Sequence, residues 1–191
     1  MRPRRQVGLL SLLGAALVAL WSMLGPSARP LMAGGTELTL QSVPTKVYFS
    51  PKGGATEAVV AALSQAKKSV LVQAYSFTSA PIAAALKAAH DRGVGVRVIL
   101  DKSQRTERYT SATFLAHAGI PVWIDASHAI AHNKVMVIDE ATLITGSFNF
   151  TKAAEEHNAE NLLIISDRGL ASVYRQNWEA HLAHSESYQA P

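Results

Sequence analysis

The pattern of apolar and polar positions beyond residue 45 alternates between two kinds of segment. One kind is a short apolar run, rich in β-branched residues and bounded by glycine, proline or polar residues, which predicts a buried strand. The other kind repeats apolar residues every three or four positions, which predicts a helix. The predicted strands are 47–49, 69–75, 94–100, 121–124, 134–138, 143–145 and 161–165, and the predicted helices are 56–66, 80–91, 112–118 and 169–184.

This order of elements predicts an α/β fold. Strands that alternate with helices of this length favour a largely parallel sheet with helices on both faces. The predicted strands 134–138 and 143–145 are separated by only a few residues, which suits an antiparallel hairpin. We therefore expect a mixed, largely parallel sheet flanked by helices on both faces.

The first thirty or so residues do not follow this pattern. A start rich in arginine precedes an uncharged stretch, 7–24, and small residues follow at Ala28 and Ala33. This order is typical of a secretory signal. We predict a signal peptide over 1–33, cleaved after either alanine, and a single periplasmic or secreted domain over 34–191. The alternative is an uncleaved membrane anchor, because eighteen uncharged residues approach the lower limit for a spanning helix.

Removing that segment changes the charge balance. The chain has 18 Lys+Arg and 14 Asp+Glu, but four of the arginines and none of the acidic residues lie before residue 34. The remainder carries no net charge, so any basic surface for nucleic acid must be local. The chain has no cysteine, which excludes disulfides and thiolate metal sites.

A histidine and a lysine stand two positions apart in one predicted strand. His132 and Lys134 therefore leave the same face, and this is costly on a central strand unless they face a polar cleft. Lysine supplies positive charge for a phosphate oxygen, and imidazole attacks or transfers protons near neutral pH. The pair suits a phosphate diester. On spacing alone, however, two solvated residues on an edge strand are the favoured interpretation.

The residues that follow extend this pair into a longer pattern, H-x-K-x4-D-x6-G-S-x-N, with an acid downstream. The pattern is filled by His132, Lys134, Asp139, Gly146, Ser147, Asn149 and Glu160. It resembles the signature of the phospholipase D superfamily, and the stretch GSFNFTKAAEEHNAEN is most similar to the small, single-motif bacterial endonucleases of the Nuc-like subgroup. The resemblance extends over essentially all of 34–191 and implies a phospholipase D-like fold and phosphodiesterase chemistry.

The resemblance also implies roles for these residues. His132 would attack phosphorus to form a phosphohistidine, and a second histidine would protonate the leaving alkoxide and then activate water. Glu160 would orient the imidazole of His132. The non-bridging oxygens would be held by Lys134, Ser147 and Asn149. Asp139 belongs to the catalytic set by the motif, although support of the strand end is its favoured role. Gly146 suits either a close backbone approach or an ordinary turn.

No cofactor and no metal are expected, because Asp139 and Glu160 do not form a carboxylate cluster of the kind that holds Mg²⁺. The mechanism needs two histidines, yet the motif occurs once. His128 and His157 are weaker candidates for the second. We therefore predict a C2 homodimer with both copies of His132 at the twofold axis.

The substrate is less well determined than the chemistry. Lys102, Arg105 and Arg108 follow a predicted strand, at the end where α/β sheets usually bind ligands, and Tyr109 and Lys152 are further candidates. They either track a nucleic-acid backbone or belong to ordinary solvated loops. The superfamily's two-motif phospholipases are much longer. This favours a metal-independent, nonspecific endonuclease acting on DNA, with RNA open.

The alternative is a phospholipase D or cardiolipin hydrolase acting in lipid degradation, which an uncleaved anchor would favour. A catalytically silent nucleic-acid-binding module is disfavoured, because every chemical position of the motif is filled.

Overall fold

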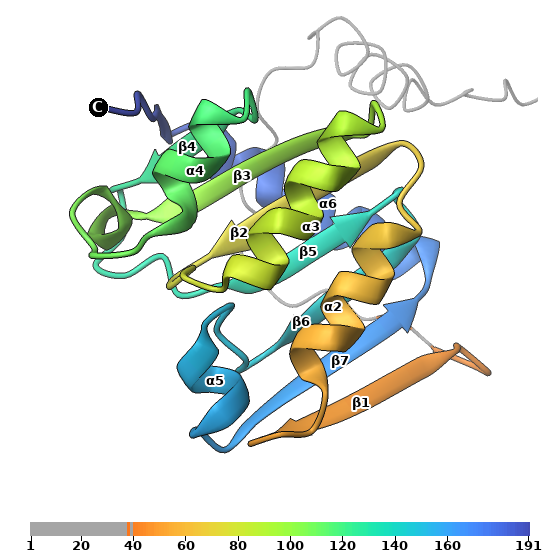
Figure 1. Ribbon diagram of the computed structural model, residues 1–191. Coiled ribbons are helices and arrows are strands. Elements are labelled where there is room, and N and C mark those ends of the chain that lie inside the picture. Colours follow the sequence, from red (N-terminus) through yellow and green to blue (C-terminus); the bar gives the residue numbers. More distant parts are fainter. Residues whose placement is uncertain (1–37, 39) are drawn as a thin grey trace, which may run out of the picture. The chain divides into compact units, whose positions relative to one another are not determined.

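Eight strands form one sheet in the computed structural model, which describes residue 38 and residues 40–191 (Figure 1). Their order across the sheet is β1-β7-β6-β5-β2-β3-β4-β8. The strands are β1 (Thr45–Ser50), β2 (Ser69–Ala74), β3 (Gly95–Asp101), β4 (Val122–Asp125), β5 (Lys134–Ile138), β6 (Thr142–Gly146), β7 (Glu160–Ser166) and β8 (Glu186–Ser187).

Helices cover both faces of this sheet, as predicted. On one face lie α2 (Ala55–Ser64), α3 (Ala80–Asp91) and α4 (Ser111–His117), and α6 (Arg168–Leu182) lies on the other (Figure 1). Alternate residues of the central strands serve the two faces: Met136 packs in the core under the first three helices, and Val137 packs in the core under α6. The Trp178 indole of α6 donates a hydrogen bond of 2.8 Å to the Val72 carbonyl in the buried sheet.

The mixed α/β fold is confirmed, but the expectation of a largely parallel sheet is wrong. Only the pairs β2–β3 and β3–β4 are parallel, and the other five neighbouring pairs are antiparallel. A parallel pair needs a long crossover, usually a helix, and only α3 and α4 connect neighbouring strands in this way. The run β5–β6–β7 has no such helix, because only the five-residue α5 (Lys152–Glu156) lies within it.

The predicted strands and helices are all present, within a few residues at their ends. The structure adds three short elements that have no periodic apolar pattern: the 3-10 helix η1 (Lys102–Arg105), α5 and the edge strand β8. None of the helices in 38 and 40–191 is long and apolar enough to cross a membrane. The predicted signal peptide, 1–33, lies outside the described residues.

Candidate active site

The motif residues meet at one edge of the sheet because of the antiparallel pairing. β5 begins with Lys134 opposite Ala74 near the end of β2, and β6 ends at Gly146 opposite Leu162 near the start of β7. The end of β2, the start of β5, the end of β6 and the start of β7 therefore share an edge. This edge carries His132, Lys134, Ser147, Asn149 and Glu160, which we call the half-site.

His132 and Lys134 differ sharply in burial, although both side chains lie beside the Tyr75 ring. Lys134 is 5% exposed, whereas His132, just before β5, is exposed. The Lys134 ammonium donates a 2.7 Å hydrogen bond to the His132 carbonyl and lies 5.2 Å from the centre of the Tyr75 ring. Tyr75 also packs against the imidazole, with 4.6 Å between ring centres. Tyr75 thus positions both groups. Tyr75 is not part of the sequence motif, so nothing in the sequence indicated this role.

Burial makes Lys134 electrostatically unusual. Desolvation lowers the pKa of Lys134 to about 8, and the nearby negative charge of Glu160 acts in the opposite direction. A phosphate oxygen arriving beside the ammonium would favour the charged form. Burial alone thus disfavours the ammonium form of Lys134, and a phosphate bound beside it would stabilise that form.

The turn after β6 depends on a close backbone approach. A Cβ built on Gly146 would lie 2.2 Å from the Asn161 carbonyl oxygen, and the φ of Gly146 is +153°. This contact, rather than an ordinary turn, explains the glycine. The approach lets the Ser147 and Phe148 amides donate to the Asn161 carbonyl at 3.1 and 3.2 Å.

The Ser147 hydroxyl is held in place but keeps its proton free. Its oxygen accepts hydrogen bonds from the backbone and side-chain nitrogens of Asn161, at 3.1 and 3.3 Å. Both contacts use the hydroxyl as an acceptor, so its O–H can still donate to a substrate oxygen.

Asn149 presents a buried polar atom that makes no hydrogen bond within the described residues. That atom is its side-chain oxygen, Oδ1. Buried polar atoms are rarely left without a partner. A half-turn of the amide would present its N–H₂ at the same place, where it can donate to a phosphate oxygen. Asn149 is therefore suited to the phosphate-binding role that the motif implies.

Glu160 begins β7 and lies close enough to influence Lys134. Its carboxylate accepts a hydrogen bond of 3.2 Å from the Asn158 side chain. Among the hydrogen bonds of residues 38 and 40–191, none joins Glu160 to His132. The orienting role for Glu160 stays a prediction.

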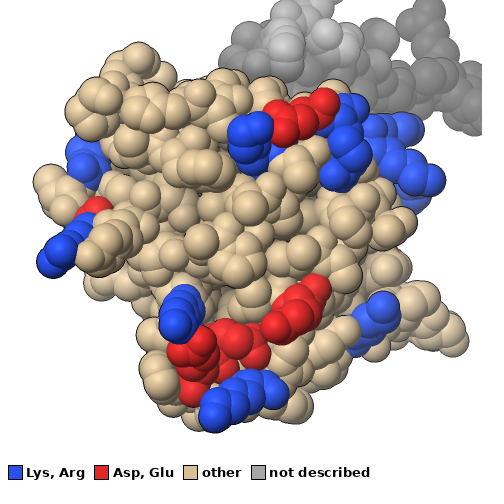
Figure 2. Space-filling view, in the orientation of Figure 1, with Lys and Arg blue, Asp and Glu red and all other residues tan. Residues whose placement is uncertain are grey.

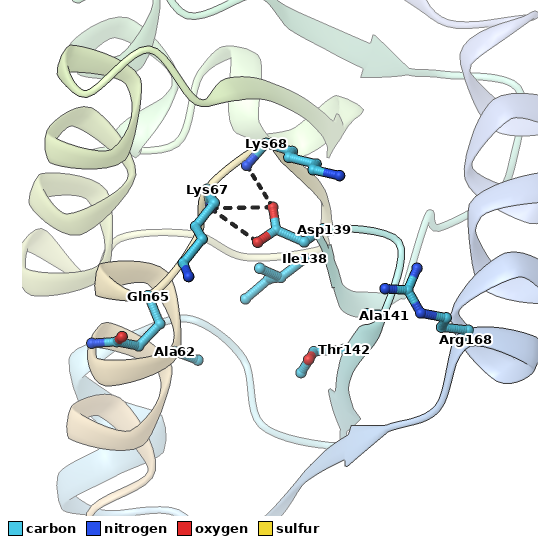
Figure 3. A pocket seen from close by; sticks show the side chains of 9 residues that line it. All are labelled: Ala62, Gln65, Lys67, Lys68, Ile138, Asp139, Ala141, Thr142 and Arg168. Atoms are coloured by element: carbon cyan, nitrogen blue, oxygen red, sulfur yellow. Dashed lines mark hydrogen bonds between the residues drawn. The ribbon is translucent and has the colours of Figure 1, made fainter.

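Asp139 lies at the opposite end of β5, five residues and about 16 Å along the strand from Lys134. Its carboxylate accepts hydrogen bonds from the backbone amides of Lys67 and Lys68, at 2.9 and 2.7 Å (Figure 3), and from the amide of Ser69, at 3.0 Å. Burial alone would raise the pKa of Asp139, but these hydrogen bonds and the Lys68 charge lower it below its ordinary value. Its positive φ of 53° fits the tight turn after the strand.

A shallow pocket of about 400 Å³ adjoins Asp139, and Figure 3 shows Lys67, Lys68 and Arg168 around it. This pocket is at the edge of the sheet away from the half-site. Asp139 therefore ties the β5–β6 hairpin to the loop before β2. The geometry supports the structural role, and it places Asp139 outside contact with a phosphate bound at His132.

The candidate substrate-binding residues are mostly engaged within the chain. Lys102 donates to the His128 carbonyl at 3.0 Å, Arg105 pairs with Glu186, and Lys152 lies 3.5 Å from Glu156. Arg108 stacks its guanidinium 4.8 Å above the ring of Tyr109, which is 75% exposed. Arg108 and Tyr109 follow β3, whose end shares the sheet edge of the half-site.

The charged side chains do not form a continuous basic surface on the face covered by α2, α3 and α4. Figure 2 shows groups of both signs near the margins of this face and a largely uncharged centre. This agrees with the balanced charge of the sequence after residue 34. On this face, therefore, basic side chains occur only in local groups.

Residues 59–182 match the family described as "Cardiolipin synthase, PLD-like domain". The chain belongs to the phospholipase D superfamily. It is 43% identical over 143 residues to a phospholipase D of Rickettsia prowazekii, covering 75% of this chain and 69% of the relative. It is 35% identical over 117 residues to a mitochondrial cardiolipin hydrolase of Xenopus tropicalis, covering 61% and 56% of the two chains.

A solved structure extends the likeness to the fold. The phospholipase D family member Nuc from Salmonella typhimurium superposes with a TM-score of 0.75 at 38% identity, covering 78% of this chain and 100% of Nuc. The Nuc-like subgroup and the phospholipase D-like fold predicted from the motif are confirmed. This superfamily member is a phosphodiesterase, a hydrolase of phosphate diesters.

Proposed function

We propose that this phospholipase D superfamily member is a metal-independent, nonspecific endonuclease that cleaves DNA, with RNA as a further substrate, through a phosphohistidine on His132. The observation that carries the choice of nucleic acid is the exposed Arg108–Tyr109 stack. It lies in the loop that follows β3, and the end of β3 shares a sheet edge with the half-site. An aromatic ring and a guanidinium suit base stacking and backbone contact. The likeness to Nuc over the whole length of that chain adds support.

The chemistry follows from the half-site in two steps. The imidazole of His132 attacks phosphorus, and the bond from phosphorus to the leaving oxygen breaks as that oxygen takes a proton from a second, protonated histidine. The second histidine, now neutral, removes a proton from water, whose oxygen attacks phosphorus and displaces His132. Lys134, Ser147 and Asn149 stabilise the negative charge of each five-coordinate transition state.

The second histidine is proposed to come from a second copy of the chain in a C2 homodimer. Within the described residues, His128 is held by Asp125 at 3.1 Å, and His157 is an exposed side chain 3.7 Å from Glu156. His132 is exposed at the sheet edge, where another copy can reach it. An isologous contact would bring two His132 side chains together.

Mixed dimers test this arrangement. Differently tagged wild-type and His132→Ala chains are refolded together, and the heterodimer is purified by both tags. We expect the heterodimer to lose at least about 100-fold in cleavage rate, because it lacks one of the two required histidines. A heterodimer with half of the wild-type rate would overturn the shared site, and an active, strictly monomeric preparation would do the same.

A lipid substrate is the second candidate, favoured by the relatives named phospholipase D and mitochondrial cardiolipin hydrolase. Plasmid nicking in EDTA is measured beside hydrolysis of phosphatidylcholine and cardiolipin, with Lys134→Met as a matched inactive control. Nicking that depends on Lys134, without lipid hydrolysis, is the expected result. Lipid hydrolysis without nicking would replace the endonuclease by the lipid enzyme, and neither activity would favour the silent binding module.

The proposed location is the periplasm or the medium, with anchoring by an uncleaved segment as the alternative. The support is the sequence of 1–33. Amino-terminal sequencing of the exported protein checks this: a new terminus after Ala28 or Ala33 is expected, and an intact terminus in the membrane fraction would favour the anchor.

A further inference from the structure

One aspartate and three histidines form a second group of possible metal ligands at the end of β4, away from the half-site. Asp125 is the last residue of β4, and His128 lies in the following loop. His181 lies in the last turn of α6, and His184 follows just after its end. One ligand atom from each of the four lies within 4.8 Å of the other three. The sequence predicted no metal, on the ground that Asp139 and Glu160 form no carboxylate cluster. The four residues here are up to 59 positions apart and share no local motif.

Three imidazole nitrogens point at a single carboxylate. His181 Nδ1 lies 2.7 Å from Asp125 Oδ2, His128 Nδ1 lies 3.1 Å from both oxygens, and His184 Nε2 lies 3.3 Å from Oδ2. The three rings are neighbours as well, with centres 4.9 to 5.3 Å apart. The nitrogens thus converge on one point instead of facing separate partners.

These spacings resemble those of a tetrahedral metal site. With metal–ligand bonds of about 2.0–2.1 Å, ligand atoms of a tetrahedron lie about 3.3 Å apart. The contacts of Asp125 with the imidazoles, 2.7 to 3.3 Å, reach this value at their upper end. The widest separation in the group, 4.8 Å, needs to shorten by about 1.5 Å. Rotations of the partly exposed His128 and His184 rings can supply that shift.

The surroundings suit a carboxylate ligand. Asp125 has no exposed side-chain surface, and besides its contacts with the three imidazoles it accepts a hydrogen bond of 3.1 Å from the Ser127 amide. A buried carboxylate beside three imidazoles offers both oxygen and nitrogen donors to a cation.

We propose that Asp125, His128, His181 and His184 bind one divalent transition-metal ion, with Zn²⁺ as the best match. Imidazole nitrogens suit zinc and its neighbours in the first transition row, whereas Mg²⁺ and Ca²⁺ prefer oxygen ligands. Four protein ligands close the coordination sphere, which is the mark of a structural site rather than a catalytic one. The ion would clamp the end of α6 to the end of β4.

The site is distinct from the half-site. β3 and β2 separate β4 from β5 in the sheet, so three strand spacings, about 14 Å, lie between the two groups. The ion would stabilise the fold without touching the phosphate. This inference does not rest on the proposed endonuclease function.

The test measures Zn²⁺ binding to the tag-free chain after dialysis against a chelator. We expect one equivalent by calorimetry, and a Tm increase of roughly 5–10 °C when free Zn²⁺ exceeds its Kd by 100-fold. Co²⁺ added in place of Zn²⁺ should give the intense visible absorption of a tetrahedral ion. His128→Gln and His184→Gln change partly exposed side chains, 40% and 29% exposed, so both variants should fold.

Each of these two variants should weaken Zn²⁺ binding by more than about 100-fold, since even residues one contact further from a metal contribute 10- to 100-fold. His117→Gln is the matched control, because His117 is exposed on α4 and outside the group. Binding that survives both ligand variants, or that falls equally in His117→Gln, would overturn the site. So would a folded chain that takes up no Zn²⁺ at all.

Discussion

Replacing Lys134 by methionine should abolish cleavage and yet stabilise the fold. Lys134 is 5% exposed, and burial lowers its pKa from 10.5 to about 8. The unfolded chain therefore binds more protons than the folded chain between about pH 8 and pH 10.5, and the free energy of unfolding rises with pH across that window. Below pH 8 the whole cost of holding the charged lysine is present.

The size of this effect follows from the shift in pKa. A difference of 2.5 units corresponds to about 3 kcal/mol at neutral pH. Methionine also loses the hydrogen bond from the ammonium to the His132 carbonyl, worth about 1 kcal/mol. The net expectation at pH 7 is a gain of about 2 kcal/mol in the free energy of unfolding. The gain should disappear near pH 10, where the folded wild-type lysine is largely neutral.

Urea unfolding of wild type and Lys134→Met at pH 7 and pH 10 measures this difference. Lys46→Met is the control, because Lys46 is exposed on β1 and its replacement should change stability by less than about 0.5 kcal/mol. The reasoning fails if Lys134→Met is less stable than wild type at pH 7, or if its gain is the same at both pH values.

The same shift predicts the pH dependence of the wild-type enzyme. If the charged form of Lys134 binds the substrate phosphate, kcat/KM should fall about tenfold between pH 7 and pH 9, since the protonated fraction drops from about 0.91 to about 0.09. The decline in kcat should lie at higher pH, because bound phosphate favours the ammonium. A flat kcat/KM over this range would show that Lys134 is not the titrating group.

Three further predictions concern residues that support the site. Gly146→Ala should lose about 2–4 kcal/mol of stability in urea unfolding, because the added Cβ would clash with the Asn161 carbonyl oxygen. Gly93→Ala is the control: Gly93 also has a positive φ, but no atom of the described residues lies near its Cβ position, so the loss should be about 1 kcal/mol. Equal losses in the two variants would contradict the close backbone approach at Gly146. Asp139→Asn should lower the free energy of unfolding by about 1–3 kcal/mol at neutral pH, and this difference from wild type should fade as the pH falls through the lowered pKa of Asp139. A difference that persists in acid would show that the carboxylate charge is not what stabilises the turn. Tyr75→Leu should lower kcat more than it raises KM in the cleavage assay, because the ring packs against the imidazole of His132; an unchanged kcat would remove Tyr75 from the site.

Local sequence was sufficient for the longer strands and helices and for the motif residues, but not for the short elements η1, α5 and β8. The apolar runs of β2 and β5 and the helical spacing of α3 appear where they were predicted, because burial on a strand or helix imposes a period that any short segment displays. The motif from His132 to Asn149 is read in the same way, since its residues lie within eighteen positions of the chain.

Tertiary structure decided which residues meet. The sheet is mainly antiparallel because β5 pairs with β2 and β7 with β1, partners far apart in sequence that no local pattern specifies. Because of the same pairing, the half-site residues lie together at one edge of the sheet, and Asp139 lies at the opposite edge. Asp125 and His181 are 56 residues apart and hydrogen-bonded because α6 returns across the sheet to β4. Sequence alone thus determined the chemistry available, through local periodicity and the motif, and only the non-local packing of strands and helices decided where that chemistry is assembled.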